Sequence, residues 1–149
     1  MSRNKLDMLK EETDGLALAA THLQYSIARC ADLIGQDHLP PEQLERLESL
    51  SSRFARVADL LSQRVFRLFD VIEQTGASTV LDRIYRAEKR GWLDASEMIK
   101  IRELRNMIAH EYAAEKMTEI YATVYALAQT LLIIVPNVTA AAQRLVARA

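Results

Sequence analysis

Hydrophobic residues recur along most of this chain at spacings of three, four or seven positions, which is the pattern of an amphipathic α-helix. The first stripe predicts a helix over about residues 4–34, ended by Gly35. A second helix is expected over about 41–74, because Pro41 suits a first helical turn. Shorter stripes predict a third helix over about 78–90, a fourth after residue 94 and a fifth that begins near Lys116.

Local signals refine the ends of these helices. Asp94 and Glu97 have the spacing of a capping box, and Trp92 is expected to pack the preceding turn onto the other helices. Pro136 should break or kink the fifth helix, leaving a short terminal helix over 138–149. Because the loops are short, the sequence predicts an all-α fold, an antiparallel bundle of four or five helices.

Composition supports a single domain over residues 1–149. Half of the 149 residues are hydrophobic, with only 4 Gly and 3 Pro, which favours helices around one full core. The net charge of −1 provides no global positive field to attract nucleic acid, so any such binding needs a local patch.

Cys30, the single cysteine, is expected to be buried, and no arrangement of residues suggests a metal site or a cofactor. The charged start of the chain and the short apolar run at 131–135 predict a cytoplasmic protein without a membrane span.

One short stretch carries candidate chemistry. Arg105, Asn106, His110 and Tyr112 lie close together near the end of the fourth predicted helix. Arginine offers a planar fork of donors to phosphate, and histidine exchanges protons near neutral pH, so the set suits a site that binds or cuts a phosphodiester. In that interpretation His110 moves protons, Arg105 neutralises charge on the phosphate and Asn106 assists.

Helix geometry limits this interpretation. Arg105 and His110 would point about 140° apart on one straight helix, so they cannot both face one small group. Either the helix ends near Ala109, or two chains share the site across a two-fold axis. In the alternative without chemistry, Arg105 pairs with a neighbouring glutamate and His110 caps the helix.

Several other cations are candidates for RNA contact. Arg102 lies one turn before Arg105. Arg83, Arg86 and Arg90 recur at helical spacing on the third predicted helix with Lys89 beside them, where a solvated face is the simpler interpretation when the helix is taken by itself. A further set shares one face of the second predicted helix, where a solvated surface is the simpler interpretation and RNA contact the alternative. Its members are Arg53, Arg56, Arg64 and Arg67.

The stretch at 104–112, which reads LRNMIAHEY, resembles the Arg-x4-His-x-Tyr signature of HepT-like proteins in the HEPN superfamily. The segments at 81–93 and 53–59 are similar to the same group, so the resemblance spans roughly residues 51–132. It implies a HEPN-like helical homodimer in which the two Arg-His motifs meet at the dimer cleft. It also implies a ribonuclease toxin whose partner, a minimal nucleotidyltransferase, acts as antitoxin by transferring AMP to Tyr112.

Three hypotheses follow for function. The first is a metal-independent HepT-like ribonuclease toxin, with Arg105, Asn106 and His110 as catalytic residues and RNA as substrate. The second is a partner subunit of a nucleotidyltransferase that binds nucleotide or substrate without cutting it. Glu111 and Met107 keep this one open, because both lower the positive charge beside the motif. The third is a structural helical dimer.

Overall fold

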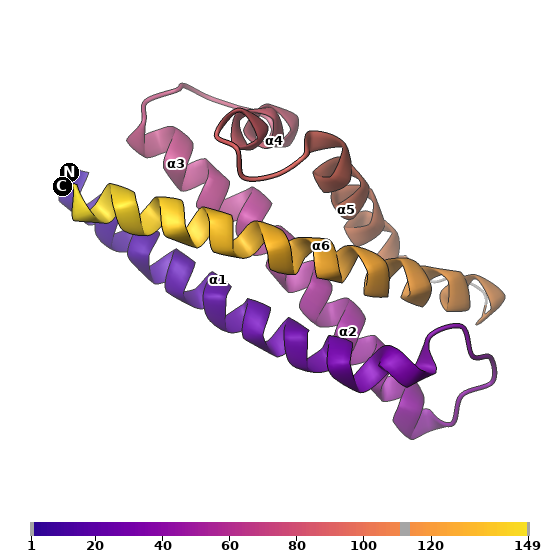
Figure 1. Ribbon diagram of the computed structural model, residues 1–149. Coiled ribbons are helices and arrows are strands. Elements are labelled where there is room, and N and C mark those ends of the chain that lie inside the picture. The colour runs from indigo at the N-terminus through magenta and orange to yellow at the C-terminus, as the bar shows by residue number, and fades with distance from the viewer. Residues whose placement is uncertain (1, 111–113, 149) are drawn as a thin grey trace.

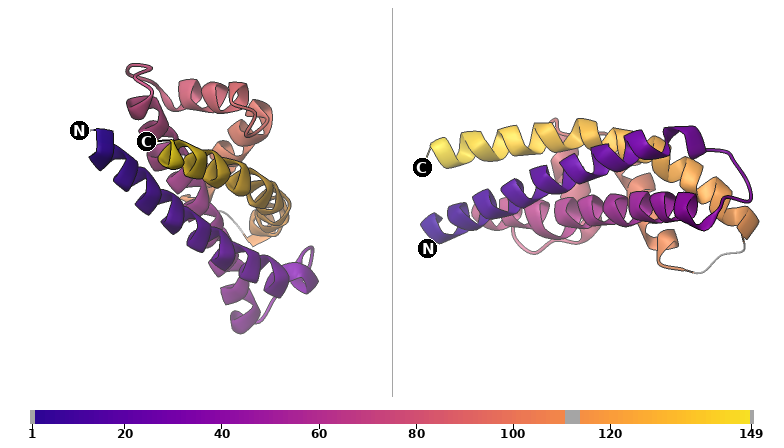
Figure 2. Two further views of the ribbon diagram at one scale, coloured as in Figure 1. Left: turned by 60° about the vertical axis from the view of Figure 1, so that its left-hand side comes forward. Right: turned by 90° about the horizontal axis from the view of Figure 1, so that it is seen from below.

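The computed structural model describes residues 2–110 and 114–148, and every regular element in these ranges is helical (Figure 1). Three long rods set the architecture. Helix α1 (Ser2–Cys30) runs antiparallel to α6 (Ala114–Ala147), so the start of α1 and the end of α6 lie at the same end of the bundle. The third rod joins α2 (Pro41–Asp59), a π-helical segment (Leu60–Val65) and α3 (Phe66–Ile72) without interruption. The short helices α4 (Val80–Lys89) and α5 (Ala95–Ile108) pack beside it (Figure 2). The predicted all-α bundle is thereby confirmed.

One contiguous hydrophobic cluster holds the rods together. On α1, the residues Leu9, Leu16, Leu23 and Cys30 recur every seven positions and are fully buried. Burial raises the pKa of the Cys30 thiol, whose Sγ donates to the Arg46 carbonyl at 3.2 Å. The prediction of a buried Cys30 is thus confirmed.

Trp92 closes the core beneath the turn between α4 and α5. Its ring meets Phe69 edge-on, with centroids 4.6 Å apart, and lies 6.0 Å from the ring of Phe66. The predicted packing of this turn onto the bundle is confirmed.

The π-helical segment was not predicted. Val57, Leu61, Val65 and Phe69 follow one another at steps of four and are all buried. In a regular helix each such step drifts by about 40°, so the stripe would turn about 120° away from the core. The wider π turn takes up most of this drift and keeps all four side chains facing inward.

One predicted helix start is corrected, and another start has a cap that was not predicted. The capping box belongs to α4, where Thr79 and Asp82 cap each other at 3.0 and 3.1 Å. At the start of α5, Asp94 does act as N-cap, but its carboxylate accepts from the N–H of Ser96 at 2.8 Å, in place of the expected box with Glu97. The hydroxyl and N–H of Ser96 lower the pKa of Asp94.

Pro136 neither breaks α6 nor starts a separate terminal helix, so the predicted break and the predicted terminal helix are wrong. The helix runs through Pro136, which is exposed, while Val135 and Val138 on either side are buried in the core. Asn137 donates to the Trp92 carbonyl at 3.0 Å and further ties this region to the bundle. Packing on both sides of the proline thus offsets the cost of an internal proline, which is about 3 kcal/mol for the lost hydrogen bond and the ring clash together.

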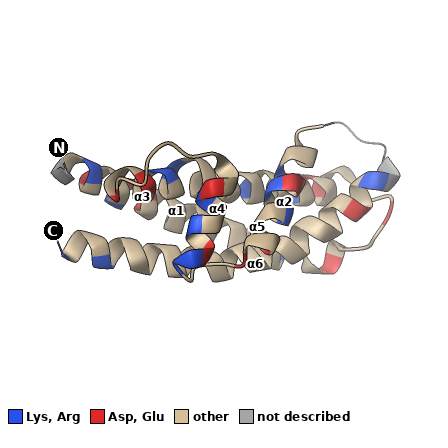
Figure 3. Cartoon of the chain, turned by 90° about the horizontal axis from the view of Figure 1, so that it is seen from above, with Lys and Arg blue, Asp and Glu red and all other residues tan. Residues whose placement is uncertain are grey.

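Helix α6 carries no charged residue between Ile120 and Gln143, and Figure 3 shows the resulting uncharged rod beside the charged helices. The helical stretch Lys116–Ala147 is long and apolar enough to cross a membrane by length and composition. A core helix of a soluble protein meets the same criterion, and Val124, Ala128 and Leu131 are fully buried against the bundle.

Candidate functional site

Helix α5 positions the first half of the sequence motif. Its buried face, which includes Met98, Ile101 and Leu104, packs onto the core and turns Arg102 and Arg105 outward along one edge. The helix ends at Ile108, and the N–H of His110 donates to the Met107 carbonyl at 3.0 Å. His110 therefore follows the end of the helix, as one of the two sequence-based alternatives required. Tyr112 and Glu111 lie outside the described residues.

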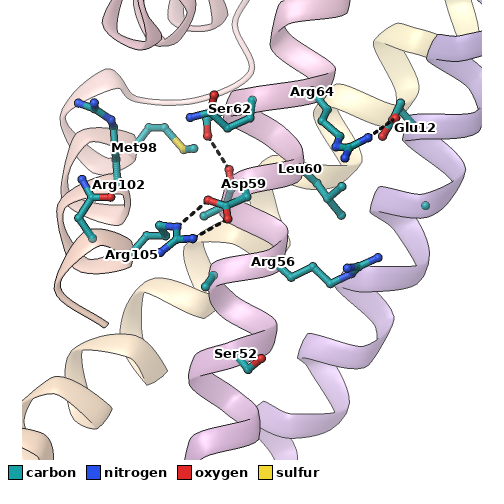
Figure 4. Close-up of a pocket in the computed structure, with 15 residues that line it drawn as sticks. Glu12, Ser52, Arg56, Asp59, Leu60, Ser62, Arg64, Met98, Arg102 and Arg105 are labelled. Carbon is teal, nitrogen blue, oxygen red and sulfur yellow. Dashed lines mark hydrogen bonds and ion pairs between the residues drawn. The ribbon is translucent and has the colours of Figure 1, made fainter. Parts of the chain in front are cut away.

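Asp59, at the end of α2, holds the Arg105 side chain. Its two carboxylate oxygens accept from Arg105 Nε at 2.7 Å and Nη2 at 2.9 Å, a two-pronged pair drawn in Figure 4. The Asp59 hydrogen bond raises the pKa of Arg105, so the guanidinium is a permanent cation in a fixed orientation. The partner is thus not a neighbouring glutamate but an aspartate 46 positions earlier in the chain.

A groove of about 1040 Å³ lies along α2 and the π-helical segment, next to this pair (Figure 4). Helix α5 contributes Arg102, Arg105 and Asn106 to one side, and α1 contributes Glu12 and Gly15 to the other. The long central rod supplies further polar lining residues, namely Ser52, Arg56, Asp59, Ser62, Gln63 and Arg64. The groove therefore combines four arginines with two carboxylates.

His110 lines a different groove. This second groove, of about 880 Å³, is largely apolar and includes Leu44, Met117 and Tyr121. The two grooves share only Ser52 and Ala55 among their lining residues. Within one chain the fold brings Arg105 and Asn106 together but does not bring His110 into the same groove, in keeping with the 140° separation expected from the sequence.

Three partly exposed arginines, two on α4 and one at its C-cap, bind other parts of the bundle. Arg83 donates to the Ser62 carbonyl at 3.2 Å, and so satisfies an acceptor of the π-helical segment. Arg86 and Arg90 pair with Asp70, at 2.8 and 3.3 Å, and the Asp70 side chain is only 3% exposed. These contacts fasten α4 to α3, so the predicted RNA contacts of Arg83 and Arg86 would compete with existing bonds. Lys89 is exposed.

Sequence reasoning missed Asp59 and Asp70, whose importance comes from partners far along the chain. A search of the described residues for groups of three or more His, Cys, Asp or Glu side chains able to hold a metal ion found none. A scan against protein-family models gave no match, and searches of curated proteins and of solved structures found no similar chain.

Proposed function

We propose that this protein is a HepT-like, metal-independent ribonuclease of the HEPN type that acts as a cytoplasmic toxin. The observation that carries the proposal is the guanidinium of Arg105, held by two hydrogen bonds at the edge of an arginine-lined groove beside Asn106. A fixed cation in such a groove suits a phosphate that gains negative charge during cleavage.

In the proposed reaction the RNA 2′-oxygen attacks the adjacent phosphorus as its proton leaves to a base. The bond from phosphorus to the 5′-oxygen breaks, and that oxygen takes up a proton, giving a cyclic 2′,3′-phosphate and a 5′-hydroxyl. His110 moves a proton at the attacking or the leaving oxygen, Arg105 neutralises the phosphate, and Asn106 binds a non-bridging oxygen.

A second copy of the chain completes this site. His110 and Arg105 line different grooves of one chain, so a homodimer that places the two motifs across a two-fold axis supplies both groups to one phosphate. A minimal nucleotidyltransferase is the proposed antitoxin, with Tyr112 as the acceptor of AMP. The added bulk and negative charge would repel an RNA phosphate from the dimer cleft.

Two observations favour a second candidate function. Asp59 already occupies two of the donor atoms of Arg105, and His110 faces an apolar groove, which suits binding better than proton transfer. In this alternative the protein is a nucleotide- or substrate-binding partner of a nucleotidyltransferase and does not cut RNA.

The test is cleavage of a mixed RNA substrate in EDTA by purified wild type, Arg105→Ala and His110→Ala. His22→Ala, which changes an exposed histidine on α1, is the matched control. Intact mass before and after incubation with the nucleotidyltransferase and ATP reports AMP on the protein. Size-exclusion chromatography and circular dichroism verify that each variant keeps its oligomeric state and helix content.

We expect cleavage by wild type and His22→Ala, and at least a hundredfold loss in the other two variants, the scale of a general acid–base contribution of roughly 10²–10⁴-fold. Cleavage that survives in both variants would exclude the assigned catalytic residues. A folded, unmodified dimer that leaves RNA intact would favour the binding-subunit alternative.

A further inference from the structure

We propose that Arg56, Arg64 and Arg102 form a track for the backbone phosphates of single-stranded RNA, which leads along α2 to Arg105. This inference rests on the proposed ribonuclease function. It states which residues bind the RNA strand outside the cleavage site. It assigns RNA contact to the groove in place of the α4 arginines.

The positions of these side chains define an elongated site. Arg102 and Arg105 reach the groove from α5, on one side of α2, whereas Arg56 and Arg64 lie on the side that faces α1 (Figure 4). From Ser52 to Arg64 the groove follows the central rod for about 18 Å, at 1.5 Å per residue. Cations spread over such a length match an extended polyanion better than one compact phosphate group.

The arginines differ in what they already bind. Arg105 pairs with Asp59, and Arg64 pairs with Glu12 at 3.1 Å, where the Arg64 side chain is 64% exposed. Arg56 and Arg102 have no ion pair or side-chain hydrogen bond within the described ranges. Two arginine forks thus stay available to phosphate, and the four arginines exceed the two carboxylates although the whole chain carries a charge of −1.

The floor of the groove suits the rest of a nucleotide. Leu60 and Ala55 offer partly exposed apolar surface between the arginines, and Ser52 adds an exposed small polar side chain. Sugars and bases of a single strand can contact such a floor while the phosphates meet arginines, which also stack on bases. A neutral binding floor flanked by cations would give affinity with little sequence preference.

The experiment measures fluorescence anisotropy of the full-length protein with a labelled 2′-O-methyl oligonucleotide, which lacks the 2′-hydroxyl needed for cleavage. Affinity is followed against salt for wild type, Arg56→Ala, Arg102→Ala and the double variant. Arg67→Ala is the matched control, because Arg67 is exposed on the same rod but lines a different, smaller pocket. Glu12→Gln removes a carboxylate from the groove and should tighten binding.

Each lost phosphate contact lowers the slope of log affinity against log salt by about 0.7 for a single strand. For the double variant, the affinity deficit relative to wild type should therefore shrink about sevenfold between about 50 and about 200 mM salt. Arg67→Ala should keep the wild-type slope. Misfolding cannot produce the higher oligonucleotide affinity expected for Glu12→Gln. This variant therefore tests the track even if an arginine variant is unstable.

The outcomes separate this inference from the proposed function. Wild-type slopes in folded Arg56→Ala and Arg102→Ala would overturn the track, whether or not the protein cuts RNA. If the salt slopes of the arginine variants fall as expected but the wild type does not cleave RNA, the result would support the track and overturn the ribonuclease. A wild type that does not bind the oligonucleotide would also overturn the track.

Discussion

Replacing Asp59 with Asn tests the contact that orients Arg105. The substitution keeps the size of the side chain and one acceptor oxygen, but it removes the negative charge that receives two hydrogen bonds at 2.7 and 2.9 Å. Arg105 would then lose its fixed orientation at the groove. The change separates the ion pair from simple packing, because no methylene group is deleted.

The solvent exposure of Arg105 and Asp59 determines how large a coupling free energy to expect between them. A hydrogen bond to a charged group contributes about 1.5–3 kcal/mol, whereas an exposed ion pair contributes only about 0.2–1 kcal/mol. The side chains of Arg105 and Asp59 are 32% and 42% exposed, so solvent screening reduces the larger range. We expect a coupling free energy of about 1 kcal/mol, because the geometry is two-pronged. For a domain of this size, such a loss lowers Tm by about 2–4 °C.

The assay is a double-mutant cycle with Asp59→Asn and Arg105→Gln, measured by urea unfolding. A parallel cycle with Glu12→Gln and Arg64→Gln is the matched control, since that pair has a single contact at 3.1 Å and a more exposed arginine. We expect the control coupling to stay below about 0.5 kcal/mol. A coupling between Asp59 and Arg105 no larger than the control would refute the assignment of a specific clamp on Arg105.

Two further predictions concern the polar contacts that hold the short helices. Asp70→Asn should lower the free energy of unfolding by about 3 kcal/mol. The reason is that the Asp70 carboxylate, only 3% exposed, pairs with Arg86 at 2.8 Å. A loss below about 1 kcal/mol in urea unfolding would contradict this. Ser96→Ala should raise the pKa of Asp94, because it removes the Ser96 hydroxyl, whose hydrogen bond lowers that pKa most. NMR titration of the carboxyl measures this, and an unchanged pKa would count against the hydroxyl hydrogen bond. The stability from this cap is present above the unfolded pKa of Asp94 and is lost as pH falls through the lowered folded pKa.

The helices were predictable where a single rule governs them. Seven-residue recurrence on α1 and the proline at the start of α2 gave the rods, and both are local properties of the chain. The π-helical segment also has a sequence signal, the steps of four from Val57 to Phe69, which differ from the helical period. That signal indicates a wider turn only once it is known that all of these residues face the same core.

Predictions were wrong where local preference and packing compete. Pro136 has a strong local tendency to end a helix, yet Val135 and Val138 are buried on either side of it and keep α6 continuous. No feature of the sequence states how much burial each side gains. Whether the helix continues or ends at Pro136 depends on how much burial its neighbours gain against the helices that lie opposite.

The candidate site divides in the same way. The sequence by itself determined that the chain is helical and that Arg105, Asn106 and His110 lie near one helix end, because periodicity and spacing are local. Only the tertiary structure decided that Asp59 clamps Arg105, that Arg83 and Arg86 are engaged within the bundle, and that His110 lines another groove. These facts depend on contacts between residues far apart in the chain, and such contacts follow from how whole helices pack.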